Sequence, residues 1–171
     1  GNKEKIENLI IENHLELEGI KIIDPKDSEL QTQRYTYGDV LFKKRQRRGV
    51  TQYEARHKMR DRNYFGAMMV EQGDADALIS GITRNYPETI RPALQVIGTQ
   101  KGVNKIAGMY IIVTKSGPVF FADTTINVSP TARDLADIAV LAAKSVERLK
   151  IRPRIGMLSF ANFGSSDYEE T

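Results

Sequence analysis

The stretch "KIAGMYIIVTKSGPVFFADTTINVSPTARDLADIAVLAAKSVERLK", Lys105–Lys150, decides the fold class of this chain. Two apolar runs flank the turn-forming residues Lys115–Pro118, which predicts a β-hairpin. The clearest helix of the sequence follows, and we expect Ser129 to cap it and Pro130 to occupy its first position. Together with the strands and helices expected elsewhere in the chain, this hairpin and helix indicate an α/β protein. The apolar face of the helix is expected to contain Leu135, Ile138, Ala142, Val146 and Leu149.

Outside this stretch, helices are expected to alternate with short buried strands. Helical periodicity predicts helices at 3–17, 35–49, 51–62, 64–73 and 87–98, the last with Pro92 near its start. Short apolar runs closed by turn residues predict buried strands at 19–25, 75–81 and 154–160. This order is typical of an α/β fold. A change of character near Gly98–Gly102 predicts two parts, residues 1–98 and residues 99–171.

The composition is that of an ordinary folded protein. The chain has 171 residues, of which 40% are hydrophobic and 27% are charged. No run approaches the ~18 apolar residues of a membrane span, and the first residues do not resemble a secretion signal. Cysteine is absent, which excludes disulfides and thiolate metal sites and favours a reducing cytoplasm. His14 and His57 lack helical metal spacing, so we expect no metal site.

The charge of the chain is unevenly distributed. The net charge is only +3, but Lys43–Arg62 contains nine Lys or Arg and two acids. We expect Gly49 to break this run into two helices, the second opened by a capping box of Thr51 and Glu54. Three interpretations stay open for the run: a nucleic-acid arm, a solvated helix face, or the wall of a pocket for a smaller anion.

Polar loops after the predicted strands are the candidate ligand sites, because ligands of open α/β sheets collect where strands lead into helices. Arg91 precedes Pro92 at such a place and could bind a phosphate or carboxylate, or form a surface salt bridge. Asp74, Asp76 and Asp123 are either structural caps or functional acids. The sequence contains no nucleophile elbow, phosphate-binding loop or dinucleotide fingerprint.

Four ordered motifs resemble those of the phosphate acetyltransferase/butyryltransferase family. They are "GDADALISG", "TIRPALQVIGT", "FADTTINVSPTARDLADIA" and "IRPRIGMLSFANFGSS". Within that family, "RDRNYFGAMMVEQGDADALISG" and "MLSFANFGSSD" look most similar to the C-terminal transacetylase-like domain of bacterial NADP-dependent malic enzymes.

The resemblance implies a three-layer αβα fold of two subdomains, with residues 1–98 in the first and 99–171 in the second. A cleft between the subdomains would hold acetyl-CoA or CoA. The catalytic serine, arginine and aspartate of the family would fall beyond Thr171, so we expect no catalytic residue in this chain. The residues expected to bind CoA or phosphate are Arg45, Arg91, Ser80, Thr83, Ser159, Asn162, Gly164 and Ser165.

Three functions follow from these observations. The favoured one is a regulatory acetyl-CoA-binding module of a malic enzyme. It would act with its own malic domain, which would hold NADP and a divalent metal, and it would form a homo-oligomer. The second is an active phosphate acyltransferase that moves an acyl group between CoA and phosphate. The third, a nucleic-acid-binding module, lacks an aromatic stacking pattern. We therefore expect neither nucleic acid nor membrane as a partner.

Overall fold

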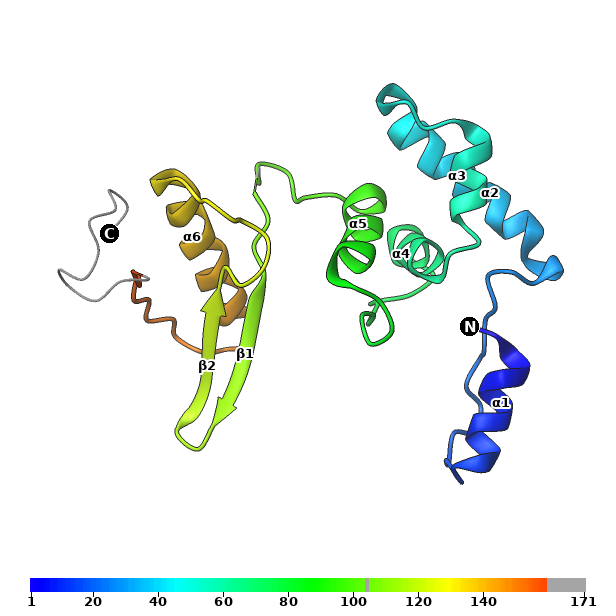
Figure 1. Ribbon diagram of the computed structural model, residues 1–171, viewed down its shortest axis with the longest axis horizontal. Helices are drawn as coiled ribbons and strands as arrows, with labels where there is room; N and C mark the ends of the chain where they lie inside the picture. Colours follow the sequence, from blue (N-terminus) through cyan, green and yellow to red (C-terminus); the bar gives the residue numbers. More distant parts are fainter. Residues whose placement is uncertain (104, 160–171) are drawn as a thin grey trace. The chain divides into compact units, whose positions relative to one another are not determined.

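The computed structural model describes residues 1–103 and 105–159 and divides the chain into two compact units, Gly1–Gly98 and Thr99–Thr171. The first unit is helical and the second combines a hairpin with a helix (Figure 1). The α-helices of the first unit are α1 (Lys3–Glu12), α2 (Gln31–Arg45), α3 (Gln52–Lys58), α4 (Arg62–Gln72) and α5 (Tyr86–Val96). The second unit contains β1 (Met109–Thr114), β2 (Gly117–Ala122) and α6 (Ala132–Arg148). Within the described ranges, no helix is long and apolar enough to cross a bilayer.

The cationic run folds into two helical pieces, as predicted. A 3₁₀ turn, Gln46–Arg48, extends α2 and ends at Gly49, whose φ of 82° is left-handed and therefore favours glycine. Helix α3 begins at the predicted capping box: the Thr51 side chain accepts from the Glu54 N–H, and the Glu54 carboxylate accepts from the Thr51 N–H. Gly49 therefore turns the backbone between two helices instead of allowing one continuous basic helix.

The first unit has a well-packed core between its helices. Helix α2 packs against α3, and α4 packs against α5. Phe65 is only 1% exposed, and its ring centroid lies 5.1 Å from that of Tyr37. The buried members of this core are Tyr37, Leu41, Ala55, Met59, Phe65, Ala67, Met68 and Val96.

Gly38 lies where α2 packs tightly against α3. A Cβ atom at this position would lie 2.6 Å from the Arg56 Cα, which is backbone and cannot rotate away. Only a residue without a side chain fits between the two helices at this separation. Gly38 therefore fixes the distance between α2 and α3.

The prediction of strands at 19–25, 75–81 and 154–160 was wrong, as far as the structure describes these residues. All described residues of these runs are outside regular strands, and β1 and β2 form the sheet. Ile79 is 95% exposed, although we expected a buried strand there. A strand needs a neighbour that accepts and donates backbone hydrogen bonds, and the described residues supply none for these runs. Residue 160 lies outside the described ranges.

The hairpin and helix of the second unit were predicted correctly. Strands β1 and β2 pair in antiparallel register, with Tyr110 opposite Phe121 and Thr114 opposite Gly117. The predicted cap of α6 was wrong by two residues. Thr131, not Ser129, is the N-cap, because Asp134 three residues later completes a capping box with it.

The position of Pro92 was also predicted wrongly. Helix α5 begins at Tyr86 after the cap Asn85, so the proline of its first turn is Pro87. Pro92 lies inside the helix, where its missing N–H leaves the carbonyl four residues earlier without its usual donor.

Candidate functional site

The polar loop predicted to bind a ligand packs against the first turn of α4. The Ser80 hydroxyl donates to Asn63 Oδ1 at 2.7 Å, and an Arg62 guanidinium nitrogen donates to Thr83 Oγ1 at 3.2 Å. Ser80 and Thr83 therefore come together at the start of one helix, although this helix precedes them by about 20 residues in the sequence.

Asn63 connects this loop to helix α5. Its side chain is buried, and its Nδ2 donates to the Glu88 carbonyl at 3.4 Å. That carbonyl is the one left without a helical donor by Pro92. Asn63 thus bonds a carbonyl freed by proline while it accepts from Ser80, which holds the loop, α4 and α5 together.

Asp61 and Arg84 close the same site. Asp61 Oδ1 accepts from the N–H groups of Asn63 and Tyr64 and so caps α4, while its Oδ2 lies 2.7 Å from a nitrogen of Arg84. The start of α4 is therefore already satisfied by a carboxylate. Any anion bound here would be held by side-chain cations and not by the helix terminus.

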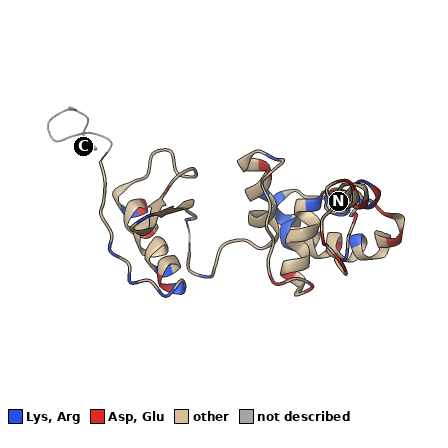
Figure 2. Cartoon of the chain, turned by 90° about the horizontal axis from the view of Figure 1, so that it is seen from below, with Lys and Arg blue, Asp and Glu red and all other residues tan. Residues whose placement is uncertain are grey.

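A cavity of about 750 Å³, which we call the α4 cavity, lies beside this turn. Its volume is in the range of small-molecule sites. The described carboxylates that line it, Asp24 and Asp61, accept hydrogen bonds from backbone N–H groups. The cations exceed them in number, and Figure 2 shows Lys and Arg spread over the helices of this unit. The cations that line the cavity are Lys26, Lys58, Arg60, Arg62 and Arg84.

The positive charge of the α4 cavity suits a phosphorylated ligand, because guanidinium groups bind phosphate in a bidentate manner and the summed field attracts anions. Arg62 and Arg84 are not among the site residues predicted from the sequence. One signal was present, since Arg60 and Arg62 flank the helix-capping Asp61 in "RDR". Their convergence with Arg84 depends on the ion pair between Asp61 and Arg84, which are 23 residues apart, and periodicity does not encode such a contact.

Arg45 and Arg91 lie on different helices of the first unit. Arg45 ends α2, and its Nε is buried without a hydrogen-bond partner among the described residues. Arg91 is exposed on α5. Helices α2 and α5 contact each other, and Lys44 Nζ donates to the Val96 carbonyl at 2.8 Å. Neither arginine lines the α4 cavity.

The remaining predicted ligand residues belong to the second unit. Ser159 is exposed and is the last described residue. Asn162, Gly164 and Ser165 lie outside the described residues.

Asp123 is a structural residue that orders the loop after β2. Its carboxylate accepts from the N–H groups of Gly108, Thr125 and Asn127 at 2.8, 3.2 and 2.7 Å. Partial burial alone would raise the pKa of this carboxyl, but these hydrogen bonds outweigh it and lower the pKa to about 2. The loop-capping interpretation of Asp123 is therefore supported by the structure.

Asp74 also has a structural partner. It accepts a hydrogen bond from the Tyr37 hydroxyl. Burial and this bond to a carboxylate together raise the pKa of Tyr37 to about 12. Across residues 1–103 and 105–159, we find no group of three or more His, Asp or Glu that could hold a metal ion.

Comparison with solved structures defines the class of this fold. The chain is similar to the EutD phosphotransacetylase from Staphylococcus aureus, with a TM-score of 0.80 and 32% identity over 99% of this chain and 50% of that one. It is also similar to a phosphotransacetylase from Streptococcus pyogenes, with a TM-score of 0.75 and 33% identity over 99% and 51% of the two chains. The predicted α/β class, resembling phosphotransacetylase, is confirmed.

Sequence comparison then gives the family. A family model described as "Phosphate acetyl/butaryl transferase" matches residues 1–171, so the chain belongs to this family. It is 39% identical to the phosphate acetyltransferase of Bacillus subtilis over all of this chain and 52% of that protein. It is 35% identical to the phosphate acetyltransferase of a Synechocystis strain over 97% of this chain and 24% of that protein. The chain thus spans about half, or less, of the length of these relatives.

The predicted malic-enzyme module was wrong. Relatives that match essentially the whole chain at 33–39% identity are phosphate acetyltransferases. The malic domain, NADP and metal expected with that module have no support in these comparisons. The two motifs that suggested it, "RDRNYFGAMMVEQGDADALISG" and "MLSFANFGSSD", therefore do not distinguish a malic-enzyme branch from the transferases.

Proposed function

We propose that the chain is part of a phosphate acyltransferase and that it binds coenzyme A and the phosphate group of an acyl phosphate. The observation that carries this proposal is the match to phosphate acetyltransferases along the whole chain. The cationic α4 cavity supports it independently, because CoA carries several phosphates and both reactants are anions.

The binding residues we propose come from both the sequence and the structure. Ser80 and Thr83 stay proposed ligands on the resemblance described above; neither lines the α4 cavity, but Thr83 accepts a hydrogen bond from Arg62, which does. Arg45 and Arg91 stay proposed phosphate ligands on the resemblance described above. Ser159, Asn162, Gly164 and Ser165 stay proposed for the second unit in the same way.

The proposed reaction transfers an acyl group. The thiolate of CoA attacks the carbonyl carbon of the acyl phosphate, a carbon–sulfur bond forms, the carbon–oxygen bond to phosphate breaks, and inorganic phosphate leaves. Negative charge grows on oxygen in the transition state, so nearby guanidinium groups stabilise it. We assign this chain the binding of the anions and no residue that makes or breaks these bonds.

Calorimetric titration of the 171-residue chain with CoA tests the binding. We expect Arg62→Ala and Arg91→Ala each to weaken CoA binding by about ten-fold, the value of one charge-assisted contact. Arg148→Ala is the matched control, because Arg148 is an exposed arginine of α6 outside the proposed site. Equal effects of all three substitutions, or no binding of CoA, would contradict the proposal.

A transfer assay tests the reaction. Acetyl phosphate and CoA are mixed with a protein of the relatives' full length that carries this chain, and thioester formation is followed by absorbance. Formation of acetyl-CoA that falls with Arg62→Ala supports the proposal, while absence of the product opposes it.

The predicted homo-oligomer and cytoplasmic location are also proposals, to be measured by analytical ultracentrifugation and cell fractionation.

A further inference from the structure

A second cavity of about 410 Å³, which we call the α2–α3 cavity, lies between helices α2 and α3. Arginine, histidine, tyrosine and glutamine side chains line it, and no carboxylate of the described residues does so. Arg60 and His57 line both this cavity and the α4 cavity. The α2–α3 cavity is therefore cationic and aromatic, a combination that the acyl-transfer proposal does not use.

Arg34 is the most informative residue of this cavity. It is only 6% exposed, and among the described residues no carboxylate pairs with it. One of its terminal nitrogens donates to the carbonyls of Pro25 and Asp27, which hold the side chain in place but do not neutralise it. A buried charge without a counter-charge is unfavourable. An anion in the cavity would supply that counter-charge.

The other two arginines of the cavity, Arg56 and Arg60, have different roles. Arg56 is committed to Asp39 through two hydrogen bonds of 2.8 and 2.9 Å, and its guanidinium covers the ring of Tyr35. Arg60 is exposed, and within residues 1–103 and 105–159 its side chain has no hydrogen bond or ion pair. Arg56 therefore shapes the cavity, while Arg60 and Arg34 can bind an anion.

Two rings on α3 offer a flat apolar surface at the same cavity. Tyr53 is 78% exposed, and its ring stacks on His57 with centroids 6.1 Å apart and planes inclined by 20°. A heteroaromatic base stacks well on such a ring. The volume of the cavity is in the range of sites for molecules of nucleotide size.

We propose that the α2–α3 cavity binds a phosphorylated purine nucleoside, with the base on the exposed face of Tyr53 and the phosphate at Arg34 and Arg60. Two sources share this chemistry: a free nucleotide and the nucleotide end of CoA. Binding of a free nucleotide does not depend on acyl transfer, because a free nucleotide carries neither a thiol nor an acyl group. Binding of the nucleotide end of CoA rests on the proposed function.

Calorimetric titration of the full chain with ADP tests this site, with inorganic phosphate and ribose 5-phosphate as partial ligands. We expect ADP to bind at least about five-fold more tightly than either partial ligand, because only ADP can stack. Tyr53→Ala should remove this advantage, and Arg60→Ala should weaken ADP and phosphate alike by about ten-fold. Both side chains are exposed, so neither substitution is expected to unfold the chain.

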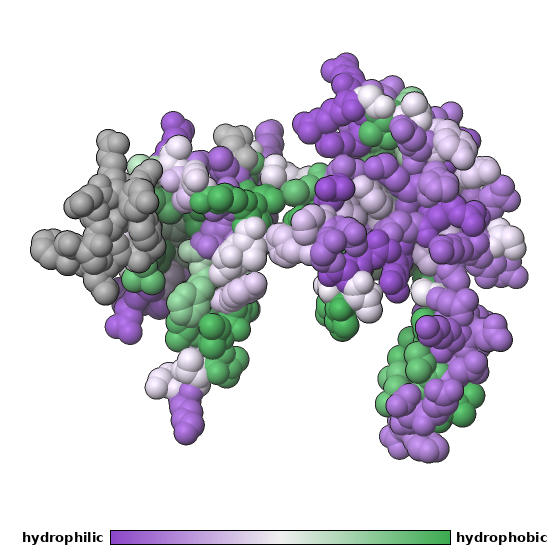
Figure 3. All heavy atoms as spheres, viewed as in Figure 1, coloured by the Kyte–Doolittle hydropathy of each residue, from purple (hydrophilic) through white to green (hydrophobic). Residues whose placement is uncertain are grey.

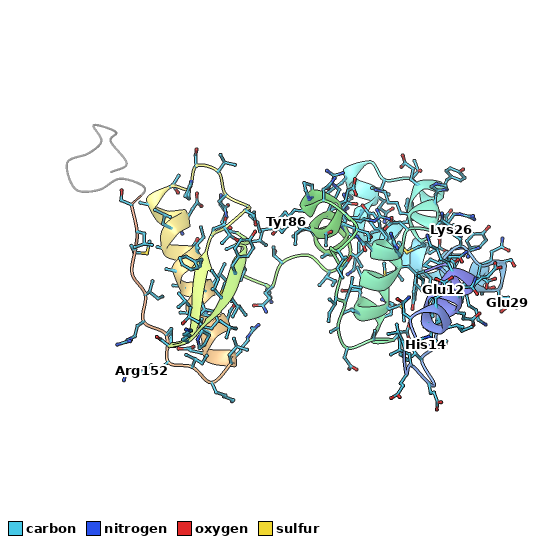
Figure 4. The ribbon with its side chains drawn as sticks, turned by 60° about the horizontal axis from the view of Figure 1, so that its bottom comes forward. Glu12, His14, Lys26, Glu29, Tyr86 and Arg152 are labelled. Atoms are coloured by element: carbon cyan, nitrogen blue, oxygen red, sulfur yellow. The ribbon has the colours of Figure 1, made fainter. Side chains whose placement is uncertain are left out.

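Matched variants control for unspecific effects. Tyr86→Ala removes an exposed ring at the start of α5 (Figure 4), and Arg47→Ala removes an exposed cation of the basic run. Both controls should change ADP affinity less than about two-fold. Absence of ADP binding, or equal loss in Tyr53→Ala and Tyr86→Ala, would overturn the proposal. Competition between CoA and ADP would identify the nucleotide end of CoA as the source, and binding of both together would identify a free nucleotide.

Discussion

The two units of the chain differ in how far their apolar side chains are buried. The helices of the first unit bury eight residues of one hydrophobic core. In the described part of the second unit, Ile138 and Val146 of α6 are buried, while apolar side chains of the hairpin are exposed. Figure 3 shows this apolar surface on the hairpin. One face of it contains the cross-strand pairs Tyr110–Phe121 and Ile112–Val119.

This difference follows from how helices and strands complete a core. A helix satisfies its own backbone and needs only an apolar stripe of a neighbour, which short connections bring close. A hairpin of two strands satisfies half of its backbone groups and leaves two faces to be covered. The first unit can therefore close its core from nearby segments, whereas the second requires more surface than α6 provides.

The largest expected effect is on the core of the first unit. Phe65→Ala should lower the free energy of unfolding by about 4 kcal/mol, since it removes a fully buried ring. Phe121→Ala is the matched control in the hairpin, where the ring is 44% exposed, and should cost less than about 1 kcal/mol. Urea denaturation measures both. Equal losses would show that the two units do not differ in packing.

Gly38→Ala should have the next largest effect. The new methyl group would meet the backbone of Arg56 at 2.6 Å and push α2 and α3 apart. We expect a loss of about 2 kcal/mol in unfolding free energy. Gly156→Ala in the second unit is the control, because its Cβ meets no atom within 4 Å, and it should leave the melting temperature unchanged.

Asp123 should stabilise the second unit in a pH-dependent manner. Asp123→Ala removes an acceptor shared by several backbone donors and should cost about 2 kcal/mol. Asp76→Ala, an exposed aspartate of the first unit, should cost almost nothing. Hydrogen exchange at the amide of Asn127 measures the loss locally.

Acid titration tests the charge of the Asp123 carboxylate without removing its side chain. Its pKa is about 2 in the folded chain against an ordinary 3.8, so the carboxylate stabilises the fold fully above pH 3.8. This contribution is lost as the pH falls from 3.8 towards 2, because the proton then binds the unfolded chain more tightly than the folded one. Protection of Asn127 that stays constant over this range would contradict the role of Asp123.

The smallest expected effect concerns the two capping boxes. Thr51→Ala and Thr131→Ala should each cost about 1 kcal/mol. We expect the loss in α6 to appear as local opening of its first turn in hydrogen exchange, because few of its residues are buried. Thr→Ser at either position keeps the hydroxyl and serves as the control. Opening confined to the first turn of α3 would contradict the expectation that the first turn of α6 opens more easily.

Local signals in the sequence predicted the local structure well. The Thr51 box, the stop at Gly49 and the hairpin each depend on residues within a few positions of one another. The strand predictions failed because an apolar run does not state which segment pairs with it, and Ile79 found no partner among the described residues.

The site was predicted only in part for the same reason. Ser80 and Thr83 were named from the family resemblance, in a loop predicted to bind a ligand; the structure brings them to the start of α4, where neither lines the α4 cavity. Arg62 and Arg84 were missed because their meeting depends on the packing of α4 against a distant loop. The family was recognised from ordered motifs, but similarity of motifs did not separate its branches, and the malic-enzyme assignment failed there.

The hairpin has a consequence for handling the chain in solution. Each of its strands has one partner in the described residues, so β1 and β2 both expose an outer edge of backbone donors and acceptors. Pro118 interrupts the donor row of β2, whereas β1 contains no proline. Self-association through edge-to-edge pairing should therefore use β1. The side chain of Ile111 is half exposed on this strand, and Ile111→Lys should reduce self-association in concentrated samples, because a charge on the edge opposes strand pairing.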